Sequence, residues 1–287
     1  MAGTLYVVAT PIGNLSDLSE RAWRTLKEVD FIAAEDTRVS RKLLAVGDFS
    51  KPVVSYHEHN KASVGPGIVE RLLKGESCAL VSDAGTPAIS DPGEDLCDLC
   101  IRAGVPVTPI PGPCAAVAAL SASGMRSGRF VFEGFLPVQK KSRRERLAEL
   151  QTERRTVILY EAPHKLRATL KDLLNTLGDR PLCLAREVTK LHEQFLRMTL
   201  AEASAYYEEN EPRGEYVLIL EGASGAEEEK TPPPGDPVCR VRALMAEGAR
   251  RSDAVKQAAR EFSMTKSELY RLALPVGQED GLPKEEP

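Results

Sequence analysis

The sequence has 287 residues, a formal net charge of −4 and 42% hydrophobic residues, which suits a globular protein of one large domain or two ordinary ones. The acidic total excludes a global attraction to nucleic acid, so any RNA contact must come from a local basic patch. The apolar run at 5–9 is too short for a signal peptide or a membrane span, and we therefore expect a cytoplasmic protein with no membrane contact.

Strands and helices alternate through the first part of the chain, which predicts an α/β domain with a mainly parallel sheet. Strands are expected at 5–9, 31–34, 53–57, 78–81 and 105–110, and helices at 17–28, 37–44, 68–75, 96–104 and 115–122. Polar residues follow most of these strands: Thr10, Glu35 and Asp36, His57, and Asp83. Because the carboxyl ends of parallel strands share one edge of a sheet, these side chains are expected to gather there.

The stretch 82–93, Ser-Asp-Ala-Gly-Thr-Pro-Ala-Ile-Ser-Asp-Pro-Gly, follows the expected strand 78–81. Gly85 allows close backbone approach to a ligand, and Pro87 stiffens the turn. Ser90 and Asp91 are expected to cap a helix that begins at Pro92. Taken alone, the stretch fits either a well-capped turn or the floor of a ligand site.

A second α/β unit is expected after Gly124, followed by a change in composition. Strands are predicted at 130–135, 156–160, 182–188, 195–199 and 214–220, and helices at 139–152, 166–177 and 200–210. We predict an N-terminal α/β domain at 1–122, a second α/β domain at 123–222, a Pro-rich linker at 223–237, a helix-turn-helix module at 238–274 and a disordered tail at 275–287.

Several common site signatures are missing from the sequence. It has no G-x-G-x-x-G, no Walker A sequence, no H-E-x-x-H and no G-x-S-x-G. His57-x-His59 lacks an identified third ligand, and the single CxxC at Cys97 and Cys100 has the i,i+3 spacing of helix packing. We expect no metal site, and reduced, mostly buried cysteines.

Seven short motifs occur in a specific order along residues 1–222. They are Thr10–Leu15, Ala34–Arg38, Ser55–Asn60, Ser82–Gly93, Pro109–Pro113, Tyr160–His164 and Arg186–Lys190. Together they resemble the ribosomal RNA small-subunit methyltransferases of the tetrapyrrole-methylase superfamily. The helical segment after the linker is similar to the C-terminal helix-turn-helix extension of those enzymes.

The resemblance implies two α/β domains of tetrapyrrole-methylase type, with the cleft for a methyl donor between them. It implies S-adenosyl-L-methionine as donor and the 2′-hydroxyl of a cytidine ribose in 16S ribosomal RNA as acceptor. The substrate is either naked RNA or the assembled 30S subunit, and a homodimer is commonly implied. By position in the motifs, the donor-binding residues are expected to be Thr10, Pro11, Asp83, Ala84, Gly85, Thr86, Ser90, Pro111, Gly112, Pro113, Ala115, Tyr160, Glu161, Gly214 and Glu215.

Deprotonation of a ribose hydroxyl requires a base, and several strand ends carry candidates. They are Glu35, Asp36, His57, Glu161, Glu187 and Lys190. We predict Asp36, Arg38 and Lys190 as catalytic residues, with Arg38 pairing with an RNA phosphate or orienting Asp36. The alternatives are a helix cap for Asp36, a surface ion pair for Arg38 and a solvated loop charge for Lys190.

Two basic stretches provide the local positive charge that RNA binding needs. They are 140–155 and the group Arg250, Arg251, Lys256, Arg260, Lys266 and Arg271. Two other functions stay open: a tetrapyrrole (precorrin-type) methylase with the same fold and donor, and a non-catalytic nucleic-acid-binding regulator built on the C-terminal helices. The first loop, Thr10-Pro-Ile-Gly-Asn14, and the basic helices favour RNA over a tetrapyrrole.

Overall fold

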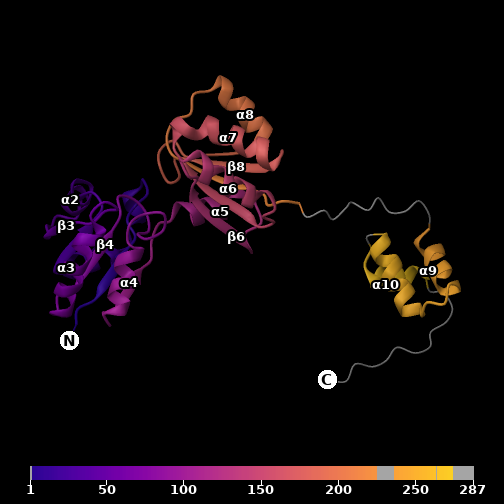
Figure 1. The fold of residues 1–287 in the computed structure, drawn as a ribbon, viewed down its shortest axis with the longest axis horizontal. Helices are drawn as coiled ribbons and strands as arrows, with labels where there is room; N and C mark the ends of the chain where they lie inside the picture. The colour runs from indigo at the N-terminus through magenta and orange to yellow at the C-terminus, as the bar shows by residue number, and fades with distance from the viewer. Residues whose placement is uncertain (1, 225–235, 263, 274–287) are drawn as a thin grey trace. The chain divides into compact units, whose positions relative to one another are not determined.

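The computed structural model describes residues 2–224, 236–262 and 264–273 (Figure 1). The described residues fall into two compact units, with the division between residues 223 and 224. Most of the expected linker, at 225–235, and the whole expected tail at 275–287 lie outside the described residues. Among the described residues, no helix is both long and apolar enough to cross a membrane.

The first sheet is entirely parallel, with strand order β3-β2-β4-β1-β5. Its strands are β1 (Leu5–Val8), β2 (Phe31–Ala34), β3 (Val53–Ser55), β4 (Cys78–Val81) and β5 (Val107–Ile110). The continuous apolar sequence of β2 and β4, each buried along its whole length, is typical of strands covered on both faces. The predicted parallel sheet is confirmed.

Helices cover both faces of this sheet. They are η1 (Leu15–Asp17), α1 (Glu20–Glu28), α2 (Thr37–Val46), α3 (Lys61–Leu73) and α4 (Glu94–Arg102). Leu26 and Leu44, from α1 and α2, pack with Ile32 on one face. Leu72 and Leu96, from α3 and α4, belong to a separate core on the other face. This two-sided packing leaves the carboxyl edge of the sheet free for loops.

The second sheet is mixed, with strand order β6-β7-β10-β8-β9. Its strands are β6 (Phe130–Phe135), β7 (Thr156–Glu161), β8 (Pro181–Arg186), β9 (Gln194–Thr199) and β10 (Tyr216–Leu220). Only β6 and β7 are parallel, since β10 inserts antiparallel between β7 and β8 and β9 pairs antiparallel with β8. The expected strands are present, but their pairing is not encoded in their local patterns.

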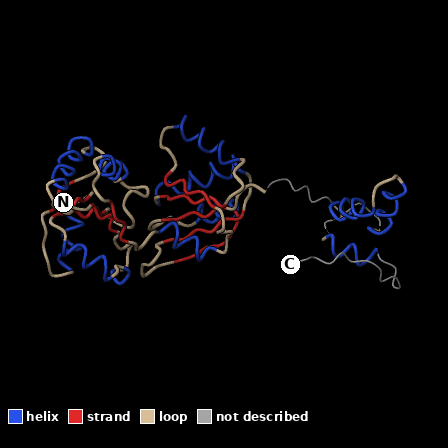
Figure 2. Tube along the Cα trace, turned by 90° about the horizontal axis from the view of Figure 1, so that it is seen from below, coloured by secondary structure: helices blue, strands red, loops and turns tan. Residues whose placement is uncertain are grey.

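The second sheet also has a helix layer on each face (Figure 2). Its helices are α5 (Ala115–Ser123), α6 (Lys140–Gln151), α7 (Pro163–Leu177) and α8 (Leu200–Glu209). The helices α6, α7 and α8 share one core. The small-residue helix α5, which we placed with the N-terminal domain, packs on the other face against β7, β8 and β10.

The C-terminal unit contains α9 (Pro237–Ala246), α10 (Arg251–Glu261) and α11 (Lys266–Ala273). Val241, Leu244, Val255 and Leu269 belong to its own buried core. The expected helix, turn and helix correspond to α10 and α11.

The expected cap of the helix after the 82–93 stretch is wrong. Helix α4 begins at Glu94, its N-cap is Gly93, and no side chain caps it. Gly93 has φ of +150°, and Ser90 has φ of +72°, so the chain is still turning where we expected helix. Asp91 is thereby free for another role.

Candidate active site

Two loops of the first sheet are joined by a pair of backbone hydrogen bonds. Thr10 N donates to Gly85 O at 2.8 Å, and Gly85 N donates to Thr10 O at 3.1 Å. Gly85 has φ of +87°, a conformation that favours glycine. Thr86 Oγ1 also donates to Pro113 O at 2.9 Å. The loops after β1, β4 and β5 therefore form one connected floor at the carboxyl edge of the sheet.

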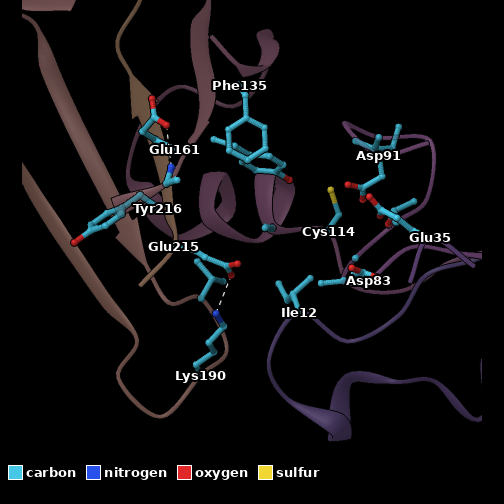
Figure 3. A pocket seen from close by; sticks show the side chains of 18 residues that line it. Ile12, Glu35, Asp83, Asp91, Cys114, Phe135, Glu161, Lys190, Glu215 and Tyr216 are labelled. Carbon is cyan, nitrogen blue, oxygen red and sulfur yellow. Dashed lines mark hydrogen bonds and ion pairs between the residues drawn. The ribbon is translucent and has the colours of Figure 1, made fainter. Parts of the chain in front are cut away.

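A cavity of about 350 Å³ lies over this floor, between the two sheets. On one side stand Glu35, Asp83 and Asp91; on the other are Phe135 and Tyr216 (Figure 3). Such a volume is within the range of small-molecule sites. The position also agrees with the rule that open α/β sheets bind ligands at the carboxyl ends of their strands.

Many of the residues predicted to bind the donor line this cavity. They are Asp83, Ala84, Gly85, Thr86, Ala115, Tyr160, Glu161 and Glu215, together with the predicted catalytic residue Lys190. The structure thus brings together the ends of β4, β5, β7 and β8 and the start of β10.

Other predicted residues do not line the cavity. Thr10 and Pro11 line a neighbouring groove. Ser90, Pro111, Gly112, Pro113, Gly214, Asp36 and Arg38 line neither hollow. Several of them still support the cavity: Pro113 accepts the Thr86 hydrogen bond, and a Cβ on Gly112 would lie 3.0 Å from the Cβ of Ala9. These are close-packing positions behind the lining.

Three carboxylates form one wall of the cavity, and no ion pair joins any of them to a cation among the described residues. Asp83 Oδ1 accepts a hydrogen bond from Asp36 N at 3.0 Å. Burial raises the pKa of Asp91 to about 6, and the charge of Glu35 adds to this, while a hydrogen bond from Ser82 opposes it. Burial, followed by the charge of Asp83, also raises the pKa of Glu35. This wall, which we call the carboxylate wall (Glu35, Asp83, Asp91), is suited to accept protons or hydroxyl hydrogen bonds.

The described residues contain no cluster suited to hold a metal ion.

Asp36 is occupied by its own helix. Its Oδ1 accepts from Arg38 N at 2.8 Å as the N-cap of α2, and its Oδ2 forms an ion pair with Arg38 Nη2 at 2.6 Å. Hydrogen bonds from Arg38 lower the pKa of Asp36 to about 2. A carboxylate with so low a pKa is a weak base.

Lys190 lies between two carboxylates. Its Nζ is 2.8 Å from Glu215 Oε2 (Figure 3). The same Nζ is 2.8 Å from Glu187 Oε1. Burial lowers the pKa of Lys190, but the hydrogen bonds to Glu187 and Glu215 outweigh burial, and the net shift is upward. Lys190 is therefore a fixed cation at the edge of the cavity.

Tyr160 and Glu161 hold the ends of two helices. Tyr160 Oη accepts from Ala116 N at 3.0 Å, in the first turn of α5. Glu161 is 4% exposed; its carboxylate accepts from Ala162 N and from Thr169 Oγ1. Both oxygens of Glu161 are thus engaged in positioning α7.

Comparison with known proteins identifies the relatives of this chain. The model of the Tetrapyrrole (Corrin/Porphyrin) Methylases matches residues 4–204. A protein of Synechocystis sp., named Ribosomal RNA small subunit methyltransferase I, is 49% identical over 277 residues, covering 96% of this chain and 98% of its own. Proteins of the same name from Bacillus subtilis and Escherichia coli O157:H7 are 44% and 43% identical, and cover 93% and 95% of this chain and 93% and 95% of their own. The chain belongs to the ribosomal RNA small subunit methyltransferase I family of tetrapyrrole methylases. It is a methyltransferase.

Solved structures confirm the fold of this tetrapyrrole methylase. A cobalt precorrin-4 methyltransferase matches with a TM-score of 0.57 at 18% identity, covering 76% of this chain and 94% of its own. Diphthine synthase matches with a TM-score of 0.61 at 14% identity, covering 76% and 90%. A uroporphyrin-III C-methyltransferase from Thermus thermophilus, complexed with S-adenyl homocysteine, has a TM-score of 0.55 at 19% identity and covers 76% and 97%. At these identities the neighbours establish the fold alone.

Sequence reasoning missed several of the residues that line the cavity of this methyltransferase. They are Ile12, Ile89, Asp91, Cys114, Phe135, Ala162, Val188 and Tyr216. Ile12, Ile89, Asp91, Ala162 and Val188 lie inside the quoted motifs, and the other three adjoin a motif or lie in a predicted strand. Asp91 was assigned to a helix cap that does not form. Phe135 marks the end of β6, and its apolar side chain gave no signal of chemistry.

Fewer of the cations on helix α6 are free of ion pairs than the sequence suggests. Arg143 pairs with Asp172 and is only 17% exposed, while Arg146 pairs with Glu133 and Glu149. Lys140 and Arg144 are exposed, and neither forms an ion pair among the described residues. The positive charge of α6 that is free of ion pairs is therefore carried by fewer residues than expected.

Proposed function

We propose that this methyltransferase uses S-adenosyl-L-methionine to methylate the 2′-hydroxyl of a cytidine ribose in 16S ribosomal RNA. The observation that carries the proposal is the cavity over the Thr10–Gly85 floor, in a chain whose relatives at 43–49% identity are named for ribosomal RNA small subunit methylation. The relatives favour RNA over a tetrapyrrole, because the tetrapyrrole enzymes match in fold at low identity.

The residues of the cavity fit the proposed donor. Its sulfur is positively charged, and the carboxylate wall presents negative charge that no ion pair neutralises among the described residues, while Lys190 at the edge of the cavity is paired with Glu187 and Glu215. The donor supplies an activated methyl group. Asp83 to Thr86 and Ala115 would hold it through backbone groups and small side chains, and Tyr160 keeps the first turn of α5 in place behind them.

Asp91 is the residue that we propose to receive the proton of the ribose hydroxyl. It lines the cavity, lies beside Glu35 and has no cationic partner among the described residues. As the ribose oxygen forms its bond to the methyl carbon, the carbon–sulfur bond breaks and the hydroxyl proton passes to an oxygen of Asp91. A base of raised pKa is better matched to this task than Asp36, whose oxygens are taken by Arg38.

Cations at the rim are proposed to hold the RNA backbone. Arg38 is 84% exposed on its side chain, so its outer nitrogen can contact a phosphate while it stays paired with Asp36. Lys190, held by Glu187 and Glu215, is proposed as a positioning residue for the substrate. Such contacts make substrate binding weaken as salt rises.

The setting of the reaction follows from the same proposal. We infer that the enzyme acts in the cytoplasm, on RNA within the 30S subunit or on its free precursor, and as a homodimer. The exposed cations of α10 and α11, among them Lys256, Lys266 and Arg271, supply further positive charge for RNA. A sedimentation measurement of the purified chain tests the dimer.

The deciding experiment maps 2′-O-methylated nucleotides in ribosomal RNA from cells with and without the gene. We expect loss of one methylated cytidine from 16S RNA, and its return when the purified protein and labelled donor are added to 30S subunits. Parallel reactions with naked RNA and with a precorrin separate the alternatives. An unchanged methylation map together with labelling of the precorrin would overturn the proposal.

A further inference from the structure

A second hollow of about 280 Å³ lies on the same floor, outside the cavity. It runs between the loop after β1 and helix α2, and we call it the α2 groove. Its lining residues are Thr10, Pro11, Gly13, Leu15, Val39, Ser40, Lys42, Leu43, Val46, Ser82 and Asp83. Asp83 lines both hollows, so the α2 groove is separated from the cavity by a single loop.

The lining of the α2 groove is mostly apolar, with Lys42 and Asp83 as its charged residues, and it is open to solvent. Leu15, Val39 and Val46 are 51%, 38% and 60% exposed. Large apolar side chains scattered singly on a surface are ordinary, but three lining one hollow suggest that something covers them. Because the groove adjoins the cavity, whatever enters the cavity from outside passes near it.

Helix α2 gives this groove a positive rim. Its sequence, TRVSRKLLAV, contains three cations and no acidic residue. Lys42 lines the groove, and neither Arg41 nor Lys42 has an ion-pair partner among the described residues. Apolar walls with an adjacent cation match a nucleotide, whose base is flat and weakly polar on its faces and whose phosphate is negative.

We propose that the α2 groove binds the base of a nucleotide next to the target nucleotide, with Lys42 near its phosphate. This inference rests on the proposed function, since the RNA must place its target ribose in the cavity. It adds a subsite: the strand crosses the loop of Asp83, with one ribose at the carboxylate wall and a neighbouring base against Val39 and Val46. The contact is with aliphatic side chains, and losing it is expected to weaken binding by about fivefold.

The test uses Val46→Asn and Lys42→Ala in the full chain. The substrate is 30S subunits from cells that lack the enzyme. Controls are Ile101→Asn, because Ile101 is 65% exposed on α4 and lines neither hollow, and Arg24→Ala, an exposed cation on α1. We expect both groove variants to raise KM for the subunits by about fivefold, with kcat and donor affinity unchanged, and both controls to behave as wild type.

Each outcome bears on one proposal. Wild-type KM in both groove variants, with active wild-type enzyme, overturns the subsite and leaves the proposed function standing. A change in oligomeric state on Val46→Asn, seen by sedimentation, also overturns the subsite, because the groove is then a contact between two copies. A wild-type chain that binds the donor but methylates no ribosomal substrate contradicts the proposed function itself.

Discussion

Lys190 lies across the α-carbon of Gly13, so that a methyl group built on Gly13 would overlap Cγ of Lys190 and lie 3.0 Å from its Cε. Gly13 lies in the loop after β1 of the first sheet, and Lys190 lies in the loop between β8 and β9 of the second. Gly13 has φ of +147°, and Lys190 is held from the other side by Glu187 and Glu215. The lysine side chain therefore packs the loop after β1 against the second α/β domain.

Gly13→Ala is expected to destabilise the protein by about 1–3 kcal/mol, because the new methyl group meets both the unfavourable φ and the lysine stem. Denaturant unfolding measures the change. Gly67→Ala is the matched control, since a Cβ there meets nothing within 4 Å and alanine favours the helix. In a Lys190→Ala background the cost of Gly13→Ala should shrink; an undiminished cost would show that backbone strain alone is responsible.

Asp91→Asn is expected to lower kcat about 10²- to 10⁴-fold, because the amide cannot take the hydroxyl proton. Methylation of 30S subunits measures the rate, and calorimetry with the donor should show affinity near that of wild type. Asp36→Asn is the control, since asparagine also caps helices well and Asp36 lies outside the cavity lining. If Asp36→Asn abolishes activity while Asp91→Asn retains it, the two roles are reversed.

The pH dependence of kcat/KM provides an independent check. Asp91 must be deprotonated to act as the base, and its pKa is raised to about 6 by burial and then by Glu35. We expect activity to fall as pH decreases through about 6. Glu35→Gln removes a neighbouring negative charge and should move this fall to lower pH. If kcat/KM of Glu35→Gln falls at the same pH as that of the wild type, a group other than Asp91 is titrating.

Asp91 is also expected to cost stability at neutral pH. Its folded-state pKa of about 6 is above the ordinary aspartate value of 3.8, so the folded state binds more protons between these two pH values and stability falls as pH rises from one to the other. Asp91→Asn should therefore stabilise the protein by about 1 kcal/mol at pH 8, after allowance for solvent screening. Thermal unfolding of both proteins should show this gain disappearing below pH 4; an equal gain at every pH would point to packing instead.

The sequence predicts the parts of the site better than their arrangement. The strands ending at Ala34 and Val81 are predicted because continuous apolar runs bounded by turn residues are a local signal. The floor around Gly85 is predicted because a glycine followed by Thr-Pro indicates a special turn. The antiparallel insertion of β10 is not, since strand pairing depends on contacts between distant segments.

The errors at individual residues have the same origin. Asp91 has the sequence context of a helix cap, and only the left-handed turn at Ser90 moves it away from the helix start. Arg143 has the sequence context of a solvated basic face, and only the packing of α7 supplies Asp172 as its partner. The sequence identifies the charged residues, and the fold determines which of them form ion pairs and which remain unpaired.

The bridge between Thr10 and Gly85 consists of main-chain atoms that every residue other than proline carries. The Thr10 hydroxyl adds to this bridge, because Oγ1 donates to Ser82 O at 3.3 Å and to Gly85 O at 3.4 Å, and the φ of +87° at position 85 favours glycine. Substitutions around the bridge can change what the two hollows recognise while the width of the floor stays the same. An enzyme built in this way can acquire a new substrate preference without moving the loops that we propose to hold the donor.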